Sequence, residues 1–426
     1  VLALGVLVRY TRAINGKPED AARNLSLLLM IMVGTLALGR AACYFEPSGF
    51  VVPVAAGPIL LAILTNVRVA TLAAMLIPAL VSVQFDYNWR LLVVGWAMSL
   101  AGALSIVKVR RRSDITAAAL KATGVGLVTI LAATLATDSL FDDLARYRVL
   151  LVVLNGCACL FMVPGLLSPL ERLFGITTDI QLLEYSDLNN EVLSRLAIEI
   201  PATYAHSLIM GQLAEAACEA IGANGLLARV CAYYHDIGKM RRPEYFSENQ
   251  SGVNIHDTLS PRLSARAIAS HVTEGAVLAR EHHLPKPIID GILEHHGTSL
   301  ISFFYQQALA QNKHGDVRNE DYRYPGPKPQ TRETAILMIC DGVESGVRSI
   351  KHPNEERVRE FVDRIITSRA ADRQFDECNL TLKELDKVKE VVTRFVLTTM
   401  HRRIAYPEKA PESQIANVIP LAGSKE

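Results

Sequence analysis

Apolar segments of membrane-spanning length occupy the first 170 residues, and they restrict the fold of this chain more than any other feature. Six of them are separated by short loops: Leu25–Cys43, Phe50–Thr65, Val67–Val83, Leu91–Val107, Ala117–Ala136 and Val149–Leu167. An α-helix needs about 20 residues to cross the hydrocarbon core of a bilayer, and roughly 17 are tolerated. Residues 1–170 are therefore predicted to form a seven-span helical membrane domain, in which Val1–Val8 is the remnant of the first span.

The two segments that meet near Asn66 and Arg68 are marginal in length. We expect them to form either two short spans or a re-entrant element. Half of all residues in the chain are hydrophobic, which is too apolar for an average soluble protein of 426 residues.

Basic residues in the short loops predict the orientation of the membrane domain, because Lys and Arg favour the cytoplasmic side. Seven spans place two basic loops on one side, and everything after Leu167 on that same side. The loops contain Arg9, Arg12, Lys17 and Arg23, and then Lys108, Arg110, Arg111 and Arg112. The C-terminal half is therefore predicted to be cytoplasmic.

After Leu167 the composition changes to that of a helical soluble domain. We predict a connector over residues 171–190, a second domain over 191–406 and a flexible tail over 407–426. No useful strand alternation appears, so the fold class is all-α. Helical patterns cover Tyr204–Ile221, Leu226–Ile237, Pro261–Glu281, Pro287–His296, Ser299–Gln311, Glu333–Val347, Glu355–Arg369 and Leu382–Arg403.

The remaining bulk properties are less informative about function. The 44 basic and 43 acidic residues nearly cancel, so the total charge neither favours nor excludes a nucleic acid. The seven cysteines form no C-x-x-C pair, and we interpret them as reduced packing residues. The chain begins at Val1 inside an apolar run, which we interpret as a fragment that has lost its N-terminus.

The central chemical signal is His235-Asp236, followed by Ile-Gly-Lys239. An adjacent His and Asp can bind metal from one turn, and an aspartate can bridge two ions through its two oxygens. A second such pair, His256-Asp257, stands in a polar loop and is assigned to loop structure. The dipeptide alone therefore carries little weight.

Four further histidines and one aspartate in apolar helical patterns support His235-Asp236 as a functional motif. They are His206, His271, His295, His296 and Asp341. Taken singly, each is as readily a packed core residue, a helix cap or a member of an ion pair. Burying all of them in one helical core is unfavourable unless they are paired or bind cations. The set as a whole therefore predicts a metal site.

The distribution of these residues predicts two divalent transition-metal ions. His206, His235, Asp236 and Asp341 would form one site, and Asp236 with His271, His295 and His296 the other. Imidazole and carboxylate ligands suit Fe, Mn, Zn or other transition metals, with Fe or Mn expected first, and the lack of thiolates disfavours structural zinc. Paired ions activate water and hold a phosphate, so phosphodiester hydrolysis is the expected reaction, with Asp236 as a catalytic residue.

The motifs HDIGK, HHGTS, RYPGPKPQ and ICDGVESGVRS resemble those of seven-transmembrane HD-domain receptors, the PgpH-type cyclic-di-AMP phosphodiesterases. The resemblance covers essentially the whole chain. It implies an extracellular domain and a further span ahead of Val1. Ala202, Gly225 and Cys340 depart from the family pattern, where Gly, Pro and Ala are usual, but none of them is a predicted metal ligand.

The resemblance implies that cyclic di-AMP is hydrolysed to the linear dinucleotide pApA. It also implies that His206, His235, Asp236, His271, His295, His296 and Asp341 bind the two metals. The expected location is the bacterial cytoplasmic (inner) membrane, with several spans and a cytoplasmic HD domain. The lipid bilayer and cyclic di-AMP are the expected partners, together with an unknown extracellular signal and no nucleic-acid polymer; a homodimer is left open.

Three further residues are candidates for contact with the substrate. Lys239 lies one turn beyond the dipeptide and is predicted to contact phosphate and assist catalysis. Lys328, in PGPKPQ, is a second candidate phosphate contact, and Tyr305 is a candidate for stacking on adenine. For each of them an ordinary surface or packing role is the alternative.

Three other functions are alternatives to this one. Enzymes of the HD-GYP class, which act on cyclic di-GMP, need a Gly-Tyr-Pro after the histidine pair, but Gly297-Thr298-Ser299 stands here. Other nucleotide hydrolases of the HD type are usually soluble. A non-catalytic nucleotide-binding receptor tends to lose a metal ligand, and this chain has lost none.

Overall fold

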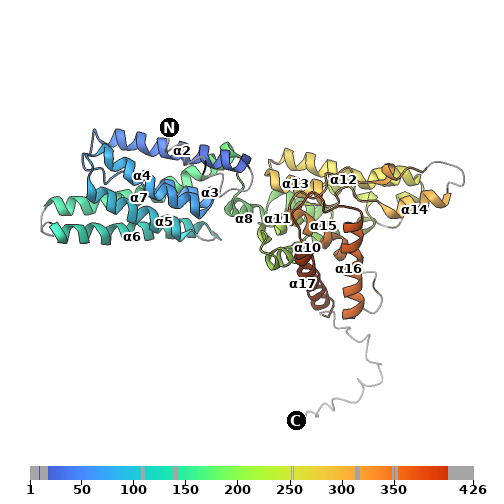
Figure 1. The fold of residues 1–426 in the computed structure, drawn as a ribbon. Coiled ribbons are helices and arrows are strands. Elements are labelled where there is room, and N and C mark those ends of the chain that lie inside the picture. Colours follow the sequence, from blue (N-terminus) through green and yellow to red (C-terminus); the bar gives the residue numbers. More distant parts are fainter. Residues whose placement is uncertain are drawn as a thin grey trace, which may run out of the picture. The chain divides into compact units, whose positions relative to one another are not determined.

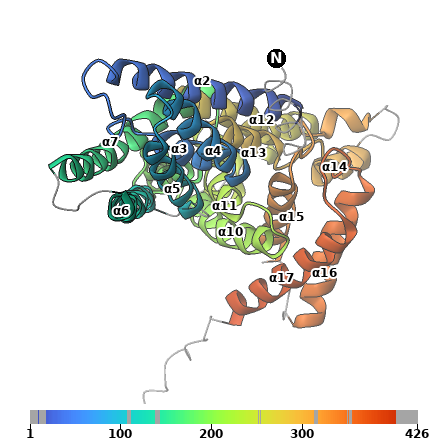
Figure 2. The ribbon, with the colours of Figure 1, turned by 60° about the vertical axis from the view of Figure 1, so that its left-hand side comes forward.

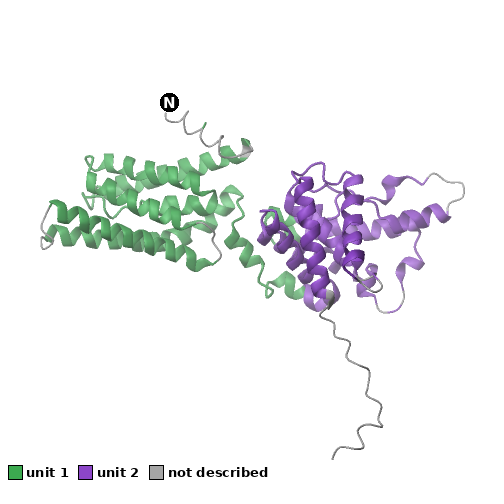
Figure 3. Ribbon diagram, turned by 60° about the horizontal axis from the view of Figure 1, so that its bottom comes forward, with its two compact units in different colours: residues 1–195, 279–289 green, residues 196–278, 290–426 purple. Residues whose placement is uncertain are grey.

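The computed structural model describes residue 9 and residues 18–106, 111–137, 143–250, 252, 254–311, 317–347, 350 and 354–401. The chain forms two compact units, shown in separate colours in Figure 3. Residues 1–195 and 279–289 make up the first unit, and residues 196–278 and 290–426 make up the second.

The first unit is a bundle of apolar helices (Figure 1). These are α2 (Pro18–Ala42), α3 (Ala56–Leu64), α4 (Val67–Gln84), α5 (Trp89–Ser105), α6 (Arg112–Thr137) and α7 (Asp143–Phe174). Helices α2, α4, α6 and α7 are long and apolar enough to cross a membrane, and α5 is a shorter apolar helix. The predicted first span, Val1–Val8, lies outside the described residues.

Large apolar side chains cover the outer face of this bundle. Val33, Val128, Leu135 and Phe161 each expose between 62% and 80% of their surface. Apolar surface of this extent would be unfavourable in water, whereas lipid tails solvate it. The first unit is therefore built to face lipid.

The marginal segment Phe50–Thr65 is helical only in its second half. Its helix, α3, has nine residues and is about 14 Å long at 1.5 Å per residue, against a hydrocarbon core of about 30 Å. Residues 50–55 turn irregularly before it and are mostly buried. The segment still runs from the end of the bundle where the Ser48 carbonyl accepts from Asn88 to the end where Asn66 lies near Ile106, which corresponds to the short-span alternative.

Side chains of the bundle satisfy the irregular backbone ahead of α3. The buried amide of Asn155 on α7 donates to the carbonyls of Phe50 and Val52 at 2.9 and 2.5 Å. Ser99 on α5 donates to the carbonyl of Val54 at 3.2 Å. Non-helical backbone is tolerated at membrane depth only where protein or water supplies such partners.

The connector packs on the first unit through α8 (Asp179–Tyr185) and continues into α9 (Glu191–Glu199). Thr178 caps α8 by accepting from the Gln181 amide and donates its hydroxyl to the buried carboxylate of Glu171. Arg112 on α6 pairs with Glu184, and Ile180 is buried in the apolar core of the unit. The connector is thus held to the membrane bundle by polar and apolar contacts.

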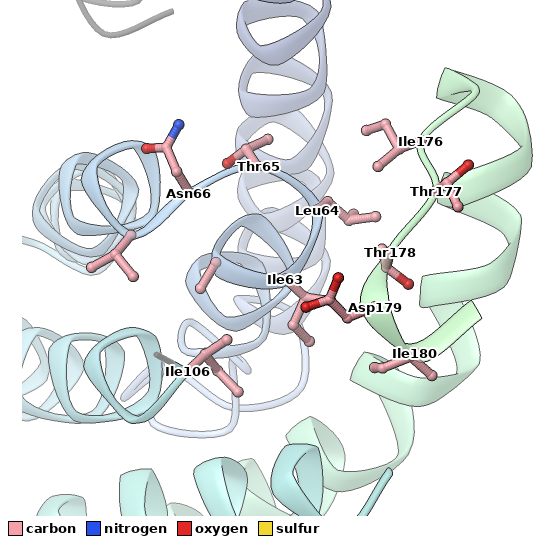
Figure 4. A pocket seen from close by; sticks show the side chains of 12 residues that line it. Ile63, Leu64, Thr65, Asn66, Ile106, Ile176, Thr177, Thr178, Asp179 and Ile180 are labelled. Carbon is pink, nitrogen blue, oxygen red and sulfur yellow. The ribbon is translucent and has the colours of Figure 1, made fainter. Parts of the chain in front are cut away.

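A cavity of about 440 Å³ lies between this connector and the membrane bundle. Figure 4 shows Thr65 and Asn66 of the α3–α4 turn on one side, with Ile176–Ile180 of the connector on the other. The end of α5 contributes Ile106.

The second unit is all-helical in its described residues, as the sequence predicts. Its larger helices are α10 (Pro201–Ala220), α11 (Gly225–Tyr234), α12 (Pro261–Glu281), α13 (Lys286–Glu294), α14 (Ser302–Gln311), α15 (Arg332–Val347), α16 (Glu355–Ala371) and α17 (Leu382–His401). The end of α12 and the start of α13, residues 279–289, belong to the first unit. Short 3-10 helices η1 (Ile237–Arg241), η2 (Pro243–Tyr245), η3 (Ser247–Asn249), η4 (Ile255–Asp257) and η5 (Asn319–Tyr322) lie in the connections. Helices α16 and α17 lie side by side in Figure 2.

Helix boundaries differ from the prediction mainly beside the chemical residues. Helix α11 ends at Tyr234 rather than at Ile237, because His235 and Asp236 leave the α-helix and the chain continues in η1. Helix α13 ends at Glu294 rather than at His296, ahead of Gly297 with its positive φ of 52°. The predicted α12 is confirmed with the same bounds, and the Ser260 hydroxyl caps it.

Replacing Asn155 tests the support of the irregular segment. Asn155→Leu removes both hydrogen bonds, and although the Val52 carbonyl keeps the Val54 amide as a donor, the Phe50 carbonyl loses its side-chain donor, so we expect the free energy of unfolding to fall by about 1–3 kcal/mol. Unfolding of the detergent-solubilised chain measures it. Thr129→Val is the control, because that exposed hydroxyl donates within its own helix. Equal stability of the two variants would contradict the assigned role.

Candidate metal centre

Seven predicted ligand residues from five helical segments of the second unit meet in one buried cluster. His206 comes from α10, His235 and Asp236 from the α11–η1 junction, and His271 from α12. His295 and His296 follow α13, and Asp341 lies on α15. Six of the seven are at most 8% exposed, and His296 is partly buried.

Asp236 lies at the centre, and its two carboxylate oxygens face different histidines. Oδ2 is 3.1 Å from His235 Nε2. Oδ1 is 3.3 Å from His271 Nε2 and 3.9 Å from His295 Nε2. A carboxylate in this position can serve two neighbouring ions.

Asp341 faces the other side of the cluster. Its Oδ1 is 3.3 Å from His206 Nε2 and 3.9 Å from His235 Nε2, and its Oδ2 is 3.6 Å from His296 Nδ1. Groups of three ligand atoms lie within 4.8 Å of one another in three combinations: His206 with His235 and Asp341, His235 with Asp236 and His295, and His271 with His295 and His296. The structure thus brings together both predicted sets.

Backbone hydrogen bonds orient three of the histidines in the same way. The Nδ1 atoms of His235, His271 and His295 lie 2.6–2.7 Å from the carbonyl oxygen three residues earlier, at Ala232, Ile268 and Ile292. Each ring can donate from Nδ1 to that carbonyl and directs its Nε2 into the cluster. Metal-binding histidines are commonly held in this way.

Two buried atoms show that the cluster suits a cation. Within the described residues, His235 Nε2 and Asp236 Oδ1 have no hydrogen-bond partner. Leaving such acceptors unpaired in a protein interior costs about 1–3 kcal/mol each. A bound divalent ion would satisfy both, so the donor set fits the two-metal prediction.

The local electrostatics favour ionised carboxylates and neutral imidazoles. Burial raises the pKa of Asp236, but the neighbouring His235 and Lys239 outweigh it and hold that pKa well below its usual range. Burial, reinforced by neighbouring histidines, lowers the pKa of His295 to about 3. Metals bind carboxylate and neutral imidazole, so this is the competent protonation state.

His206 differs from the other histidines because it lies between two carboxylates. Burial lowers its pKa, but hydrogen bonds with Asp341 and Glu344 raise it to about 10. Its Nδ1 bonds to Glu344, a buried residue one helical turn after Asp341. Sequence reasoning missed Glu344, although its spacing of three from Asp341 on one helix placed it on the same face.

Lys239 lies against the cluster, as its place in the motif predicts. Its Nζ is 2.8 Å from Asp236 Oδ2 and 2.8 Å from Glu248 Oε1. The ammonium also lies 4.9 Å from the ring centroid of Phe246, which meets the His271 ring edge to face. Residues Glu248 and Phe246 belong to the η2–η3 segment and carried no signal in the sequence.

The other two substrate candidates lie apart from these contacts. Tyr305 packs against Tyr322 in a small satellite core. Lys328 is partly exposed and lies in the loop before α15. Besides Phe246, the ring of Tyr324 reaches the cluster and stacks on His296 at 4.1 Å between ring centroids.

The second dipeptide, His256-Asp257, lies in η4 and is absent from the three ligand groups found among the described residues. The His256 ring bonds to the carbonyl of Tyr245 at 2.8 Å and packs near Phe304. It has the loop role that the sequence predicts.

Comparisons with known proteins agree with this organisation. The family described as "7TM receptor with intracellular HD hydrolase" matches residues 1–178, and the HD domain family matches residues 203–346. The chain belongs to the 7TM receptors with an intracellular HD hydrolase domain. All seven clustered residues fall inside the HD match.

Curated relatives in this family carry a specific name. "Cyclic-di-AMP phosphodiesterase PgpH" of Bacillus subtilis is 39% identical over 401 residues, covering 91% of this chain and 56% of the relative. The protein of the same name from Listeria monocytogenes is 38% identical, covering 84% of this chain and 50% of the relative. The chain thus spans about half the length of the curated relatives it matches.

A solved structure of an HD domain from one of these relatives also matches the chain. The HD domain of L. monocytogenes PgpH, in complex with cyclic-di-AMP, is 45% identical. The match covers 50% of this chain and 99% of that chain, with a TM-score of 0.48.

Gly238 lets the HD motif approach α12. A Cβ atom at this position would lie 1.9 Å from the carbonyl oxygen of His271 and 2.5 Å from the amide of Gly275. The motif therefore requires glycine here, because η1 and α12 must touch for Asp236 to reach His271.

We expect Gly238→Ala to lower the free energy of unfolding by about 3 kcal/mol or more, since backbone must move to make room. Unfolding of the detergent-solubilised chain measures the change. Gly124→Ala is the control, because a Cβ there meets nothing within 4 Å. A Gly238→Ala chain as stable as the control would refute this close packing.

Proposed function

We propose that this chain is a membrane-bound, metal-dependent phosphodiesterase that hydrolyses cyclic di-AMP to linear pApA. The observation that carries the proposal is the convergence of Asp236 and Asp341 with five histidines inside the HD match. The substrate is inferred from relatives at 38–39% identity that are named for cyclic di-AMP. Hydrolysis joins a water oxygen to phosphorus, breaks one P–O3′ bond and returns a proton to the departing oxygen.

The proposed ligands are the seven clustered residues, with Asp236 shared between the two ions. Divalent ions bound here, Fe or Mn by ligand type, would lower the pKa of water and neutralise charge on the phosphate. The chain's own residues hold the ligands in place: the backbone carbonyls fix His235, His271 and His295, and Glu344 fixes His206.

Lys239 is proposed to contact the phosphate, because its ammonium already lies beside Asp236. An ammonium has three donors, and the contacts with Asp236 and Glu248 leave one of them for a phosphate oxygen. Lys328 is proposed as a second phosphate contact from the loop that follows Tyr324. Tyr305 remains a proposed adenine contact, although its packing against Tyr322 makes it the weakest of the three.

The membrane unit is proposed to receive an extracellular signal and to pass it through a connector over residues 171–190. The packing of α8 supports this role, since movement of α6 or α7 would reach the connector through Glu184 and Thr178. The proposed domain limits are 1–170, 171–190, 191–406 and 407–426.

Matched aspartate variants test the enzymatic proposal. We expect Asp236→Asn to lower kcat/KM for cyclic di-AMP by at least about 10²-fold. Loss of a residue that only supports a metal ligand costs up to about 10²-fold in activity, and loss of a ligand itself should cost at least as much. Asp257→Asn, in the second His-Asp pair, is expected to retain activity. The assay uses the full chain loaded with Mn²⁺ and compares cyclic di-AMP with cyclic di-GMP.

Two results would count against the proposal in different ways. A chain that binds two metals but cleaves neither dinucleotide would refute the enzymatic function. Preference for cyclic di-GMP would refute only the substrate.

The proposed cytoplasmic orientation in the bacterial inner membrane predicts which ends of the first unit face outside. Tyr44, 78% exposed, follows α2 and should be external, whereas Arg111, before α6, should be cytoplasmic. A membrane-impermeant maleimide applied to intact cells should therefore label Tyr44→Cys and not Arg111→Cys. The unaltered chain controls for its seven cysteines, and the reverse pattern would overturn the orientation.

A further inference from the structure

The turn after the histidine pair is held through every polar group of Thr298. Its amide donates to Gln374 Oε1 at 2.9 Å, and its hydroxyl accepts from Gln374 Nε2 at 3.1 Å. Its carbonyl accepts from Arg323 at 2.7 Å. A Cβ on the preceding Gly297 would lie 2.4 Å from Gln374 Oε1, so the glycine permits this close approach.

Gln374 is a fully buried residue of the turn between α16 and α17. Its own amide donates to the carbonyl of Arg369, and its side chain also donates to the carboxylate of Asp372 at 2.9 Å. Because the turn itself is fixed, Gln374 can fix Thr298.

Arg323 connects its own loop, which also contains Tyr324, to the histidine turn and to the α16–α17 turn. It forms a two-point ion pair with Asp372 at 2.8 and 3.0 Å while donating to Thr298. The next residue, Tyr324, donates its amide to the carbonyl of Ser299 at 3.1 Å and stacks its ring on His296. The histidine turn and the Tyr324 loop are thus tied to one support.

His296 has particular need of this support. In the part of the chain that the structure describes, its ring makes no backbone hydrogen bond of the kind that orients His235, His271 and His295. Its ring lies against Tyr324 on one side and faces Asp341 with Nδ1. The direction of His296 therefore depends on the turn and on the stacked tyrosine.

We propose that Arg323, Asp372 and Gln374 are positioning residues of the metal centre, which hold His295 and His296 in binding geometry. Asp372 and Gln374 lie beyond residue 346, where the HD match ends, so α16 and α17 complete the site from outside that match. The inference rests on the proposed function, because it takes the histidine pair to be metal ligands.

Two variants test this role by metal affinity rather than by activity. Gln374→Met keeps a buried side chain of similar length without its hydrogen-bonding groups, and Arg323→Lys keeps the charge without the two-point geometry. For the full chain in detergent, the apparent Kd for Mn²⁺ of one of two bound ions is expected to rise by ~10–100-fold. Equilibrium dialysis measures both stoichiometry and affinity.

Arg332→Lys is the matched control. Arg332 forms an ion pair with Glu384 in the same core, and its side chain is 34% exposed, against 28% for Arg323. We expect Arg332→Lys to keep the Mn²⁺ affinity of the unaltered chain, while its thermal stability falls about as much as that of Arg323→Lys. This comparison separates positioning of the site from general stability.

The possible outcomes are distinguishable. If the unaltered chain binds no Mn²⁺, the proposed function fails and this inference fails with it. If it binds two ions and Arg323→Lys binds them equally tightly, only the inference is overturned, whether or not Gln374→Met folds.

Discussion

The second unit depends on the burial of one carboxylate, that of Asp236, which is 2% exposed. A charge removed from water must find partners, and here these are Lys239 and the imidazoles of His235 and His271. His235 and Lys239 come from the same α11–η1 segment as Asp236, whereas His271 comes from α12, so these two segments can pack only in an arrangement that brings their polar atoms to one point. Because Gly238 has no Cβ atom, η1 can pack directly against the backbone of α12.

The first unit obeys a related constraint in a different solvent. Lipid offers no hydrogen bonds, so a break in a helix needs donors or acceptors from the protein. Asn155 and Ser99 supply them to the segment ahead of α3. In both units, therefore, a few buried polar side chains determine how an otherwise apolar set of helices fits together.

The support of the histidine pair extends this principle beyond the ligands. Gln374 and Arg323 use their hydrogen bonds on the backbone of Thr298 rather than on the cluster itself. Rigid backbone at a ligand-bearing turn limits how far an imidazole can move from the position that a metal requires. Helices α16 and α17 then serve the chemistry of the site as well as the core.

The sequence by itself determined the helical class, the apolar segments of the first unit and the residue types of the site. These follow from patterns in the sequence: helical periodicity, the length of the apolar segments, and the further histidines and aspartate that accompany His235-Asp236. Only the tertiary structure showed that Phe50–Thr65 is helical over just nine residues, that Tyr324 rather than Tyr305 reaches the histidines, and that Glu344 and Gln374 support them. Contacts between segments far apart in the chain produce no periodicity in the sequence. A single Gln or Glu therefore gives no sign in the sequence of whether the fold brings a hydrogen-bond partner to it.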